Sequence, residues 1–425
     1  MSLTQLTATE MANQLRAGDI TAVELVTAHL DAASDAFVYI NADDALAVAA
    51  DVDAGKYDHH PLAGVPVVLS DVIVTKAAPT AAGSAYLDGW VAPYEATVVT
   101  RLRAAGLPIL AKARVAEFGM GNDSGAHEAV ANHQAPFALV SDTAGTARHI
   151  AAQTGTVAVK PTYGATSRYG IVAAVSSMDT VTPVARTTAD AQALHKVVVG
   201  QDELDPTSLH HQWDFTAGTE LTNITVGITT AQPADVTDES WAAYQSGLAA
   251  LENAGVKTTE VQLDALTQAR QAAHIIGAAE FSANLAKFDG VRFGNRVTPD
   301  HGTVQDMITA TRGAGFGYET KRRIILGTQL LSTGTVDSHF YPAQQVRTAI
   351  INEYDAAFNT VDALAVPAAT VQGEEYDSTN PGVGASLAGL PAASVAGVHI
   401  SAPTYADELV YRISAVVETT AGAAK

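Results

Sequence analysis

Hydrophobic and polar positions at the start of the chain follow helical spacing. The segments 7–10 (TATE) and 21–24 (TAVE) each match the capping box, in which a hydroxyl and a carboxylate bond the free N–H groups at a helix start. Gly18 follows the first helical segment, at the position where a left-handed residue commonly ends a helix. Two short helices are therefore predicted to open the chain.

Further along, short apolar runs alternate with helical segments. We expect strands at Val65–Val68, Pro108–Ala111, Ile224–Thr229 and Val256–Val261, and helices at Ala96–Ala105 and Glu239–Ala254. Strands that alternate with helices predict an α/β fold with a central sheet covered on both faces. The Pro- and Asp-rich stretch 200–216 is the best candidate for an excursion. No repeat or charged linker divides the chain, so we expect a single domain over residues 1–425.

Composition narrows the class of protein. The chain has 425 residues, 47% of them hydrophobic, which is enough for a large core. It has no cysteine, which excludes disulfides, thiolate zinc sites and a cysteine nucleophile. The 24 Lys and Arg against 45 Asp and Glu give a net charge of −21. Such an acidic field repels phosphate backbones, so we expect no direct nucleic-acid binding and attribute the charge to solubility or adaptation to salt.

The N-terminal segment and the apolar runs bear on location. Residues 1–12 carry Glu10 and lack the basic region and apolar stretch of a signal peptide. No apolar run approaches the roughly 18 residues that a membrane span needs. We therefore expect no membrane contact and a cytoplasmic protein.

Five segments carry a resemblance to one family, in order along the chain. They read VKPTYGATSRYGIV at 159–172, SSMDTVTPVART at 176–187, EFSANLAKFDGVRFG at 280–294, YETKRRIILGTQLLSTGTVDSHFYPAQQVR at 318–347 and LAGLPAASV at 387–395. Together they resemble the amidase-signature family, above all the A subunit of tRNA-dependent amidotransferases. The resemblance implies one α/β/α domain around a large mixed sheet. It also implies glutamine hydrolysis, with ammonia passed to a B subunit that amidates mischarged tRNA and a C subunit that braces the pair.

The base of that reaction is missing from the sequence. The family uses a nucleophilic serine, a second serine that relays its proton and a buried lysine, because a hydroxyl attacks weakly unless a positioned base removes its proton. The lysine follows a strand in the pattern Gly-(Ile/Val)-Pro-x-x-(hydrophobic)-Lys-Asp. Residues 61–71 read PLAGVPVVLSD, so Ser70 stands at the lysine position. Lys76 is the only nearby replacement, and we interpret it as a solvated surface charge.

The relay serine is also altered. In the family it lies in a glycine- and serine-rich loop ahead of an alanine-rich helix. Here residues 118–125 read FGMGNDSG and the chain soon reaches Ser141, so we expect both the loop and its helix to be missing. Ser124, followed by Gly125, is a superficial substitute on the upstream segment, and we give it little weight.

The nucleophile position holds a different hydroxyl. Residues 141–148 read SDTAGTAR, which places Thr146 where the family has serine. Ala144 replaces a glycine of the turn whose N–H groups would form the oxyanion hole, and its Cβ is expected to hinder that turn. His149, at helical spacing from Thr146, is a candidate new base, but we favour a surface or capping histidine. The remnant of the site is completed by Asp142, Thr143 and Gly145.

The residues expected to bind the substrate match the family's pattern only in part. An arginine at the Arg322–Arg323 pair helps hold the glutamine carboxylate in the family, and salt bridging between helices is an equally weighted alternative. Phe293 replaces the family's tyrosine and loses its hydroxyl, and the nearest match to the family's acidic residue ahead of LAGLP is Asp377. Beyond Val395 another loop is shortened.

No metal or cofactor is expected. The adjacent pairs His59–His60 and His210–His211 lack the spacing that places two imidazoles on one metal, and no phosphate-cradling glycine motif is present. The sequence favours a catalytically degenerate pseudo-amidase that acts as a scaffold, or as a subunit with B-like and C-like partners. Two alternatives stay open: an amidase with Thr146 as its nucleophile, and a structural subunit of an amidotransferase that uses free ammonia.

Overall fold

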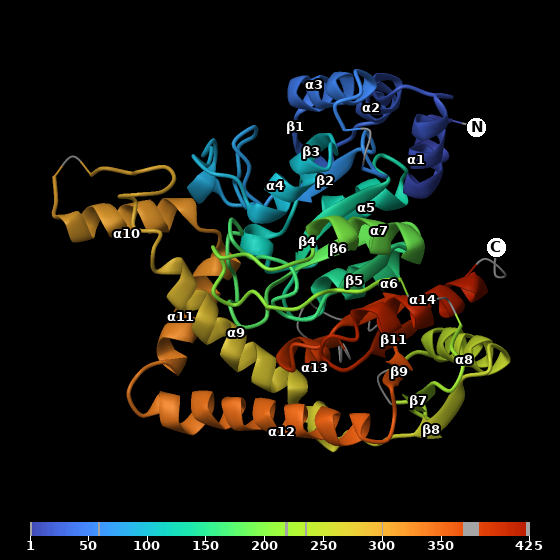
Figure 1. Cartoon of the computed structure of the whole chain (residues 1–425). Helices are drawn as coiled ribbons and strands as arrows, with labels where there is room; N and C mark the ends of the chain where they lie inside the picture. The colour runs from blue at the N-terminus through green and yellow to red at the C-terminus, as the bar shows by residue number, and fades with distance from the viewer. Residues whose placement is uncertain are drawn as a thin grey trace.

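The computed structural model describes residues 2–57, 60–216, 220–233, 236–299, 301–368 and 382–421. Its strands are β1 (Phe37–Ile40), β2 (Val67–Ser70), β3 (Ile109–Ala113), β4 (Phe137–Asp142), β5 (Val157–Lys160), β6 (Thr180–Ala185), β7 (Thr225–Ile228), β8 (Lys257–Glu260), β9 (Ala363–Pro367), β10 (Ala392–Val395) and β11 (Val398–Ser401). They form one sheet in the order β1-β3-β2-β4-β6-β5-β10-β11-β9-β7-β8 (Figure 1). The sheet is mixed, because β2 pairs in parallel with β3 and β4, and β7 with β8 and β9, whereas the other pairs are antiparallel.

Helices cover both faces of this sheet. They are α1 (Ala8–Ala17), α2 (Ala22–Asp31), α3 (Ala42–Asp53), α4 (Thr97–Ala104), α5 (Gly125–Ala131), α6 (Thr146–Thr154), α7 (Thr188–Val198), α8 (Asp238–Asn253), α9 (Ala269–Leu285), α10 (Val304–Gly315), α11 (Tyr318–Leu330), α12 (Tyr341–Phe358), α13 (Gly382–Leu387) and α14 (Asp407–Ala421). Helices α7, α8 and α14 pack on one face, and α2, α3, α5 and α6 on the other. The expected α/β/α arrangement around a large mixed sheet is confirmed.

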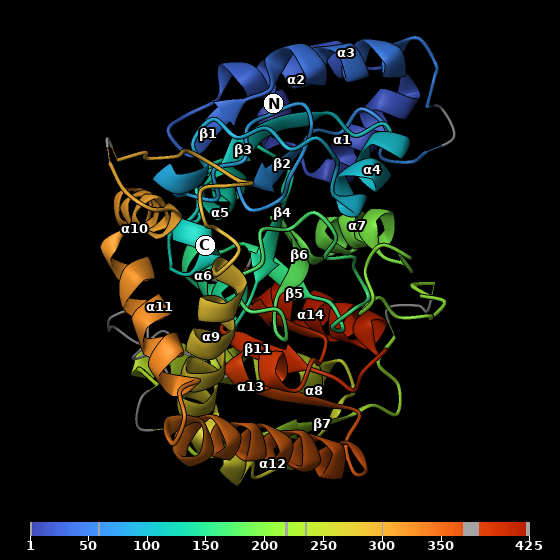
Figure 2. The same cartoon turned by 90° about the vertical axis from the view of Figure 1, so that its left-hand side faces the viewer.

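Helices α9, α11, α12 and α13 extend the face that carries α6, whereas α1 and α4 contact α7 on the opposite face. Helix α13 contacts both α6 and α9, and α9 in turn packs against α11 and α12. Figure 2 shows α2 and α3 at one end of the molecule and α12 at the other, as Figure 1 does. The N-terminal end of α6 therefore lies between the sheet and this outer group of helices.

The N-terminal helices form as the sequence predicts. Thr7 and Glu10 close a capping box at the start of α1, and Thr21 and Glu24 close another at the start of α2. Gly18 ends α1 with a left-handed φ of 73°. Each motif satisfies backbone N–H groups that a helix start leaves without an acceptor.

The predicted strands are present with shifted bounds. β2 begins at Val67 rather than Val65, and β3 begins at Ile109 rather than Pro108. The residues before these starts are Pro66 and Pro108, which have no N–H group to donate to a ladder. The other predicted strands and helices agree with β7, β8, α4 and α8 to within their end residues.

The stretch 200–216, predicted as an excursion, forms neither helix nor strand and packs closely on the chain that follows β5. Leu209 N donates to the carbonyl of Gly164 at 2.9 Å. Gly164 has a φ of +85°, and a Cβ added there would meet the carbonyl oxygen of Thr207 at 2.3 Å. Only glycine allows this close approach.

No helix in the described part of the chain is long and apolar enough to cross a membrane.

Candidate functional site

The end of β2 places Ser70 in the interior. Side chains alternate along a strand, so Ser70 shares a face with Val68, which packs in the core beneath α5 and α6. Ser70 is 3% exposed and lines a small pocket of about 20 Å³. A serine at this position is neutral at physiological pH and shorter than the lysine that the resemblance implies.

Two lysines near β2 are engaged elsewhere. Lys76 is exposed, as the sequence predicts. Lys112 is buried on β3, where Nζ lies 3.1 Å from the Asp71 carboxylate and donates to Thr80 at 2.8 Å. Burial lowers the pKa of Lys112 and raises the pKa of Asp71, and each partner opposes the shift of the other. Among the described residues, no lysine lines the small pocket or the larger one described next.

The start of α6 presents Thr146 to two neighbouring pockets. Thr146 is the first residue of α6 and lines both the small pocket and a larger one of about 90 Å³. Gly145, which precedes it, has a left-handed φ of 88°, and its N–H donates to the Asp142 carboxylate at 2.8 Å. Ala144 lines the larger pocket and has no positive φ, so its Cβ does not prevent the turn from forming. The left-handed position falls on Gly145, so the turn forms with Ala144 in place, and the effect of this Cβ on the aim of the oxyanion donors stays a prediction.

Asp142 stabilises the turn at the start of α6. Its carboxylate pairs with Arg148 at 2.8 Å, and both side chains are 0% exposed. Burial alone would raise the pKa of Asp142, but the Arg148 guanidinium and Lys160 hold it below its ordinary value. Arg148 also donates to the Gly382 carbonyl and the Ser386 hydroxyl of α13. Asp142 lines neither pocket, so its role in the described structure is to fix the start of α6.

Thr143 connects the site to the loop that follows β5. Thr143 lines the larger pocket and donates to buried Asp179 at 2.8 Å. Asp179 also accepts from the N–H groups of Ala174 and Val175. Burial raises the pKa of Asp179 to about 6. Because Val175 lines the same pocket, Asp179 ties the strand end and the loop into one wall.

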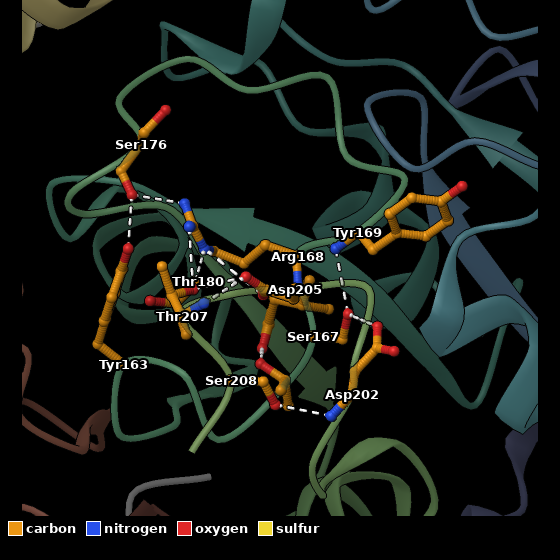
Figure 3. A network of polar contacts seen from close by, with 12 residues as sticks. Tyr163, Ser167, Arg168, Tyr169, Ser176, Thr180, Asp202, Asp205, Thr207 and Ser208 are labelled. Atoms are coloured by element: carbon orange, nitrogen blue, oxygen red, sulfur yellow. Dashed lines mark hydrogen bonds and ion pairs between the residues drawn. The ribbon is translucent and has the colours of Figure 1, made fainter.

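A polar network fixes the outer part of that loop (Figure 3). The Arg168 guanidinium donates to the Ser176 carbonyl and to the Thr207 hydroxyl, and its backbone N–H donates to Asp205 at 2.7 Å. The Tyr163 hydroxyl donates to the same Ser176 carbonyl at 2.8 Å. These contacts join the segments 163–176 and 202–208, which no local pattern in the sequence connects.

The segment ahead of β4 departs from expectation. The sequence predicts that the family's loop and its helix are missing, but helix α5 spans Gly125–Ala131 and packs against β2, β4 and β6. Gly121 and Asn122 line the larger pocket, and Gly121 and Ser124 line the small one. The prediction of a missing helix is therefore wrong, since residues assigned to the shortened region fold as α5.

His149 also departs from expectation. The sequence favours a surface or capping histidine, but His149 is 8% exposed and lines the larger pocket together with Thr146. Its Nε2 lies 3.1 Å from Gln153 Nε2, one turn along α6. The surface interpretation is wrong because α6 is covered on more than one side, by the sheet and by α5 and α13.

The two arginines of α11 have different environments. Arg323 is buried and lines the larger pocket, whereas Arg322 is exposed and lines neither pocket. Both pair with Glu319 of the same helix, at 2.6 Å from Arg322 and 2.8 Å from Arg323. The salt bridges we considered between helices thus form within one helix. The polar rim of the larger pocket is completed by Arg270 and His274 of α9.

The other sequence candidates lie away from these pockets. Phe293 packs edge-on against Trp90 and Phe288, with ring centroids 6.1 and 5.8 Å apart, and lines neither pocket. Asp377 lies outside the described residues. No group of three His, Cys, Asp or Glu side chains that could hold a metal occurs among the residues the structure describes.

Comparison with known proteins accounts for this arrangement. A family model described as Amidase matches residues 22–125 and 123–400. This chain belongs to the amidase family. The two matched segments of this amidase-family chain overlap at residues 123–125, at the start of α5, where the sequence predicts a shortened region.

Its relatives are the A subunits of amidotransferases. The chain is 40% identical to the A subunit of glutamyl-tRNA(Gln) amidotransferase from Paenarthrobacter aurescens, with 97% of this chain and 91% of the relative covered. It is 37% identical to the A subunit of the same name from Salinispora tropica, with 99% and 98% covered. The first alignment spans 481 positions, more than the 425 residues of this chain, so the relative carries insertions. The chain is thus an amidase-family protein that is similar along almost its whole length to the A subunit of glutamyl-tRNA(Gln) amidotransferase.

Solved structures of amidase-type proteins share the fold of this chain. The A subunit of glutamyl-tRNA(Gln) amidotransferase from Thermotoga maritima superposes with a TM-score of 0.76 at 26% identity, covering 99% of this chain and 95% of that one. Peptide amidase from Stenotrophomonas maltophilia has a TM-score of 0.82 at 23% identity, covering 98% and 96%, which shows the shared fold.

One group of residues near the site escaped sequence reasoning. His127 of α5 lines the small pocket and lies within hydrogen-bond distance of Ser124. The signal was present as a Ser-x-x-His spacing at a helix start, which places both side chains on one face. The Ser-x-x-His spacing was not recognised, because the segment that contains it was predicted to lack a helix.

Proposed function

We propose that this amidase-family chain is an A-type amidotransferase-like subunit that does not hydrolyse glutamine by its family's relay. It acts instead as a scaffold or structural subunit. The observation that carries the proposal is Ser70 at the end of β2, buried beside Thr146 in the small pocket. The family's relay requires its lysine base at the position that Ser70 occupies.

The chemistry of the surrounding groups supports this proposal. A threonine hydroxyl needs a base to remove its proton before it can attack an amide. Lys112 is the buried lysine nearest in the sheet, but its ammonium group is committed to Asp71 and Thr80. Lys76 is exposed on the loop that follows. Neither lysine lines a pocket with Thr146.

The retained body supports a role in assembly. The relatives are named amidotransferase subunits, and this chain covers almost all of their length. We therefore propose B-like and C-like subunits as its partners. The net charge of −21 disfavours direct contact with tRNA, so a partner would supply the basic surface.

Purified chain, alone and with co-expressed B and C subunits, should release no ammonia from glutamine or asparagine above background. Loss of general-base assistance alone lowers amide hydrolysis by about 10²- to 10⁴-fold. The measurement is ammonia release, and the positive control is the active A subunit of an intact amidotransferase. Amidation of mischarged tRNA with ammonium but not with glutamine would identify the chain as a structural subunit of a working amidotransferase.

The same assay separates the alternative of a functioning amidase. That alternative is favoured by Thr146 and His149, which line one pocket together. Ammonia release at rates near those of active relatives would overturn our proposal. If Thr146→Ala then abolished the release, Thr146 would be the nucleophile, and unchanged release would exclude it.

Restoring two family residues should not restore activity. In the double variant Ser70→Lys and Thr146→Ser, the base and the nucleophile return but the relay serine does not, since the nearby Ser124 bonds His127. We expect glutamine hydrolysis to stay at background in the ammonia assay. The single variant Ser70→Ala serves as a matched control for folding. An active double variant would show that a direct path from lysine to serine exists.

A further inference from the structure

Ser124 and His127 form a hydrogen-bonded pair beside the altered site. Ser124 Oγ lies 2.7 Å from His127 Nδ1, and His127 Nε2 lies 3.0 Å from the carbonyl oxygen of Ala147. A carbonyl oxygen can only accept, so Nε2 carries the proton and Nδ1 is left to accept from the serine hydroxyl. The histidine is thus held in the tautomer that a serine nucleophile needs.

The first turn of α6 orients this histidine. His127 is 1% exposed and is fixed by the backbone of Ala147, the second residue of α6. A nucleophile, a base within hydrogen-bond reach and a third group that orients the base are the three parts of an activated hydroxyl. All three come from segments whose positions α5 and α6 fix.

The Ser124 hydroxyl is not used for helix capping. A serine that precedes a helix ordinarily accepts a hydrogen bond from a backbone N–H of the first turn. Ser124 precedes α5 but makes no such bond, and its hydroxyl contacts His127 instead. The pair is therefore not explained by the ordinary role of serine at this position.

The pair opens toward the candidate site. Ser124 and His127 line the small pocket with Ser70 and Thr146. Thr146 and Gly121 line the larger pocket as well, so the two pockets adjoin at these residues. Ser124 and His127 do not line the larger pocket themselves, so a ligand there reaches them past Gly121 and Thr146. Replacement of a long lysine by Ser70 leaves this space open.

We propose that Ser124 and His127 are a nucleophile and base that take up short acyl groups from activated esters entering through the larger pocket. This activity goes beyond the proposed structural role and does not depend on it. It uses neither the family's lysine position nor Thr146 as nucleophile.

The reaction balances with these groups alone. Ser124 Oγ forms a bond to the acyl carbon while its proton passes to His127 Nδ1. The ester C–O bond then breaks, and His127 returns the proton to the leaving oxygen. Water completes the cycle by attacking the acyl-serine, with His127 taking one proton from water and returning it to Ser124. No oxidant, metal or further reactant is needed.

The start of α6 can stabilise the oxyanion. The Asp142 carboxylate accepts from the N–H groups of Gly145 and Arg148. The N–H groups of Thr146 and Ala147 lie between these two, in the first turn, where a helix supplies no acceptor of its own. Both residues line the small pocket. Donors at a helix start stabilise the negative charge that develops on an attacked carbonyl.

The pocket and the base restrict the substrate class. The small pocket of about 20 Å³ has room for little more than one water-sized group, so the acyl group must be short. Burial lowers the pKa of His127 to about 4, so the imidazole is neutral at pH 7 but takes up a proton weakly. Esters with good leaving groups therefore fit the pair better than unactivated amides do.

The test uses p-nitrophenyl acetate with the full chain. We expect a burst of p-nitrophenolate and an acetyl adduct on Ser124, located by peptide mass spectrometry. Ser124→Ala should abolish the adduct, and His127→Gln should slow acetylation by about 10²-fold or more. Ser338→Ala is the matched control, because Ser338 Oγ lies 2.8 Å from His339 Nδ1 but is exposed and lines neither pocket, and it should leave the burst unchanged.

Other outcomes would overturn the proposal. These are an adduct on Thr146, labelling that persists in Ser124→Ala, or no adduct on the folded wild-type chain. Thermal unfolding of each variant separates loss of reactivity from loss of fold, and Ser124→Ala is a small change even if His127→Gln destabilises α5. Ammonia release from glutamine is assayed separately, so failure of this proposal and failure of the proposed function are distinguishable.

Discussion

Arg148→Met should lower the free energy of unfolding by about 3–5 kcal/mol, the cost of breaking a fully buried ion pair. Arg148 and Asp142 are both 0% exposed and lie 2.8 Å apart. The substitution leaves the Asp142 carboxylate charged in the interior and also removes the contacts of Arg148 with Gly382 and Ser386. The start of α6 would lose these two hydrogen bonds to α13. Urea denaturation monitored by circular dichroism measures the change.

An exposed pair in the same chain provides the control. Arg322 pairs with Glu319 at 2.6 Å, but both side chains are more than two-fifths exposed, at 43% and 42%. Arg322→Met should therefore cost less than about 1 kcal/mol. The double variant Asp142→Asn with Arg148→Met should lose less stability than the two single variants summed, since no charge remains unpaired. Equal effects of Arg148→Met and Arg322→Met would show that burial does not govern this pair.

The fold could be predicted from the sequence because its signals are local. The capping boxes at Thr7 and Thr21 need only residues within one helical turn, and both form. The strand bounds shifted where Pro66 and Pro108 interrupt the ladder, a restriction that hydrophobic runs do not express. The order of strands in the sheet could not be read from local pattern. It came from the resemblance, which implied a large mixed sheet.

The candidate site was predicted in part. The resemblance identified Ser70 and Thr146, and the structure brings these distant residues to one pocket. It did not identify His127, because the shortened segment was assigned to a missing helix. A helix of seven residues, Gly125–Ala131, is stabilised by packing against β2, β4 and β6 rather than by its own sequence.

Burial was the property that sequence reasoning judged least well. His149 was assigned to the surface from its spacing on α6 alone. The spacing fixes the direction of a side chain relative to its own helix, but the neighbours come from segments far along the chain. Here α13 packs against α6 and α9 packs against α13, so His149 faces a pocket that also includes Arg270 of α9 and Val383 of α13.

Stability should fall as the pH drops from 7 to 5, because buried neutral histidines must take up protons when the chain unfolds. Burial lowers the pKa of His29 and His127 to about 4 and that of His195 to about 3, and it places the pKa of His399 well below the ordinary value. The ordinary value of 6.5 applies to the unfolded chain. Their contribution is therefore fully present above pH 6.5 and is lost as the pH falls toward 4.

Buried carboxyl groups act in the opposite direction. Burial raises the pKa of Asp179 to about 6, so its contribution is present at low pH and is lost as the pH rises through 6. Burial likewise raises the pKa of Asp71 and Asp407. At pH 5 each histidine whose pKa is lowered by burial reduces the free energy of unfolding by about 2 kcal/mol relative to pH 7. Asp179 increases it by roughly 1 kcal/mol. The four buried histidines therefore outweigh Asp179, and we expect a net loss of several kcal/mol in the free energy of unfolding between pH 7 and pH 5.

Urea denaturation at pH 7, 6 and 5 measures this dependence in wild type and two variants. His195→Gln removes one buried titrating group, whose Nδ1 lies 3.1 Å from the Tyr411 hydroxyl, and should reduce the fall in stability between pH 7 and 5 by about 2 kcal/mol. His210→Gln changes an exposed histidine and should leave the slope as in wild type. A stability that rises from pH 7 to 5, or a slope that His195→Gln does not change, would mean that the carboxyl groups dominate and that burial of the histidine rings does not control the acid response.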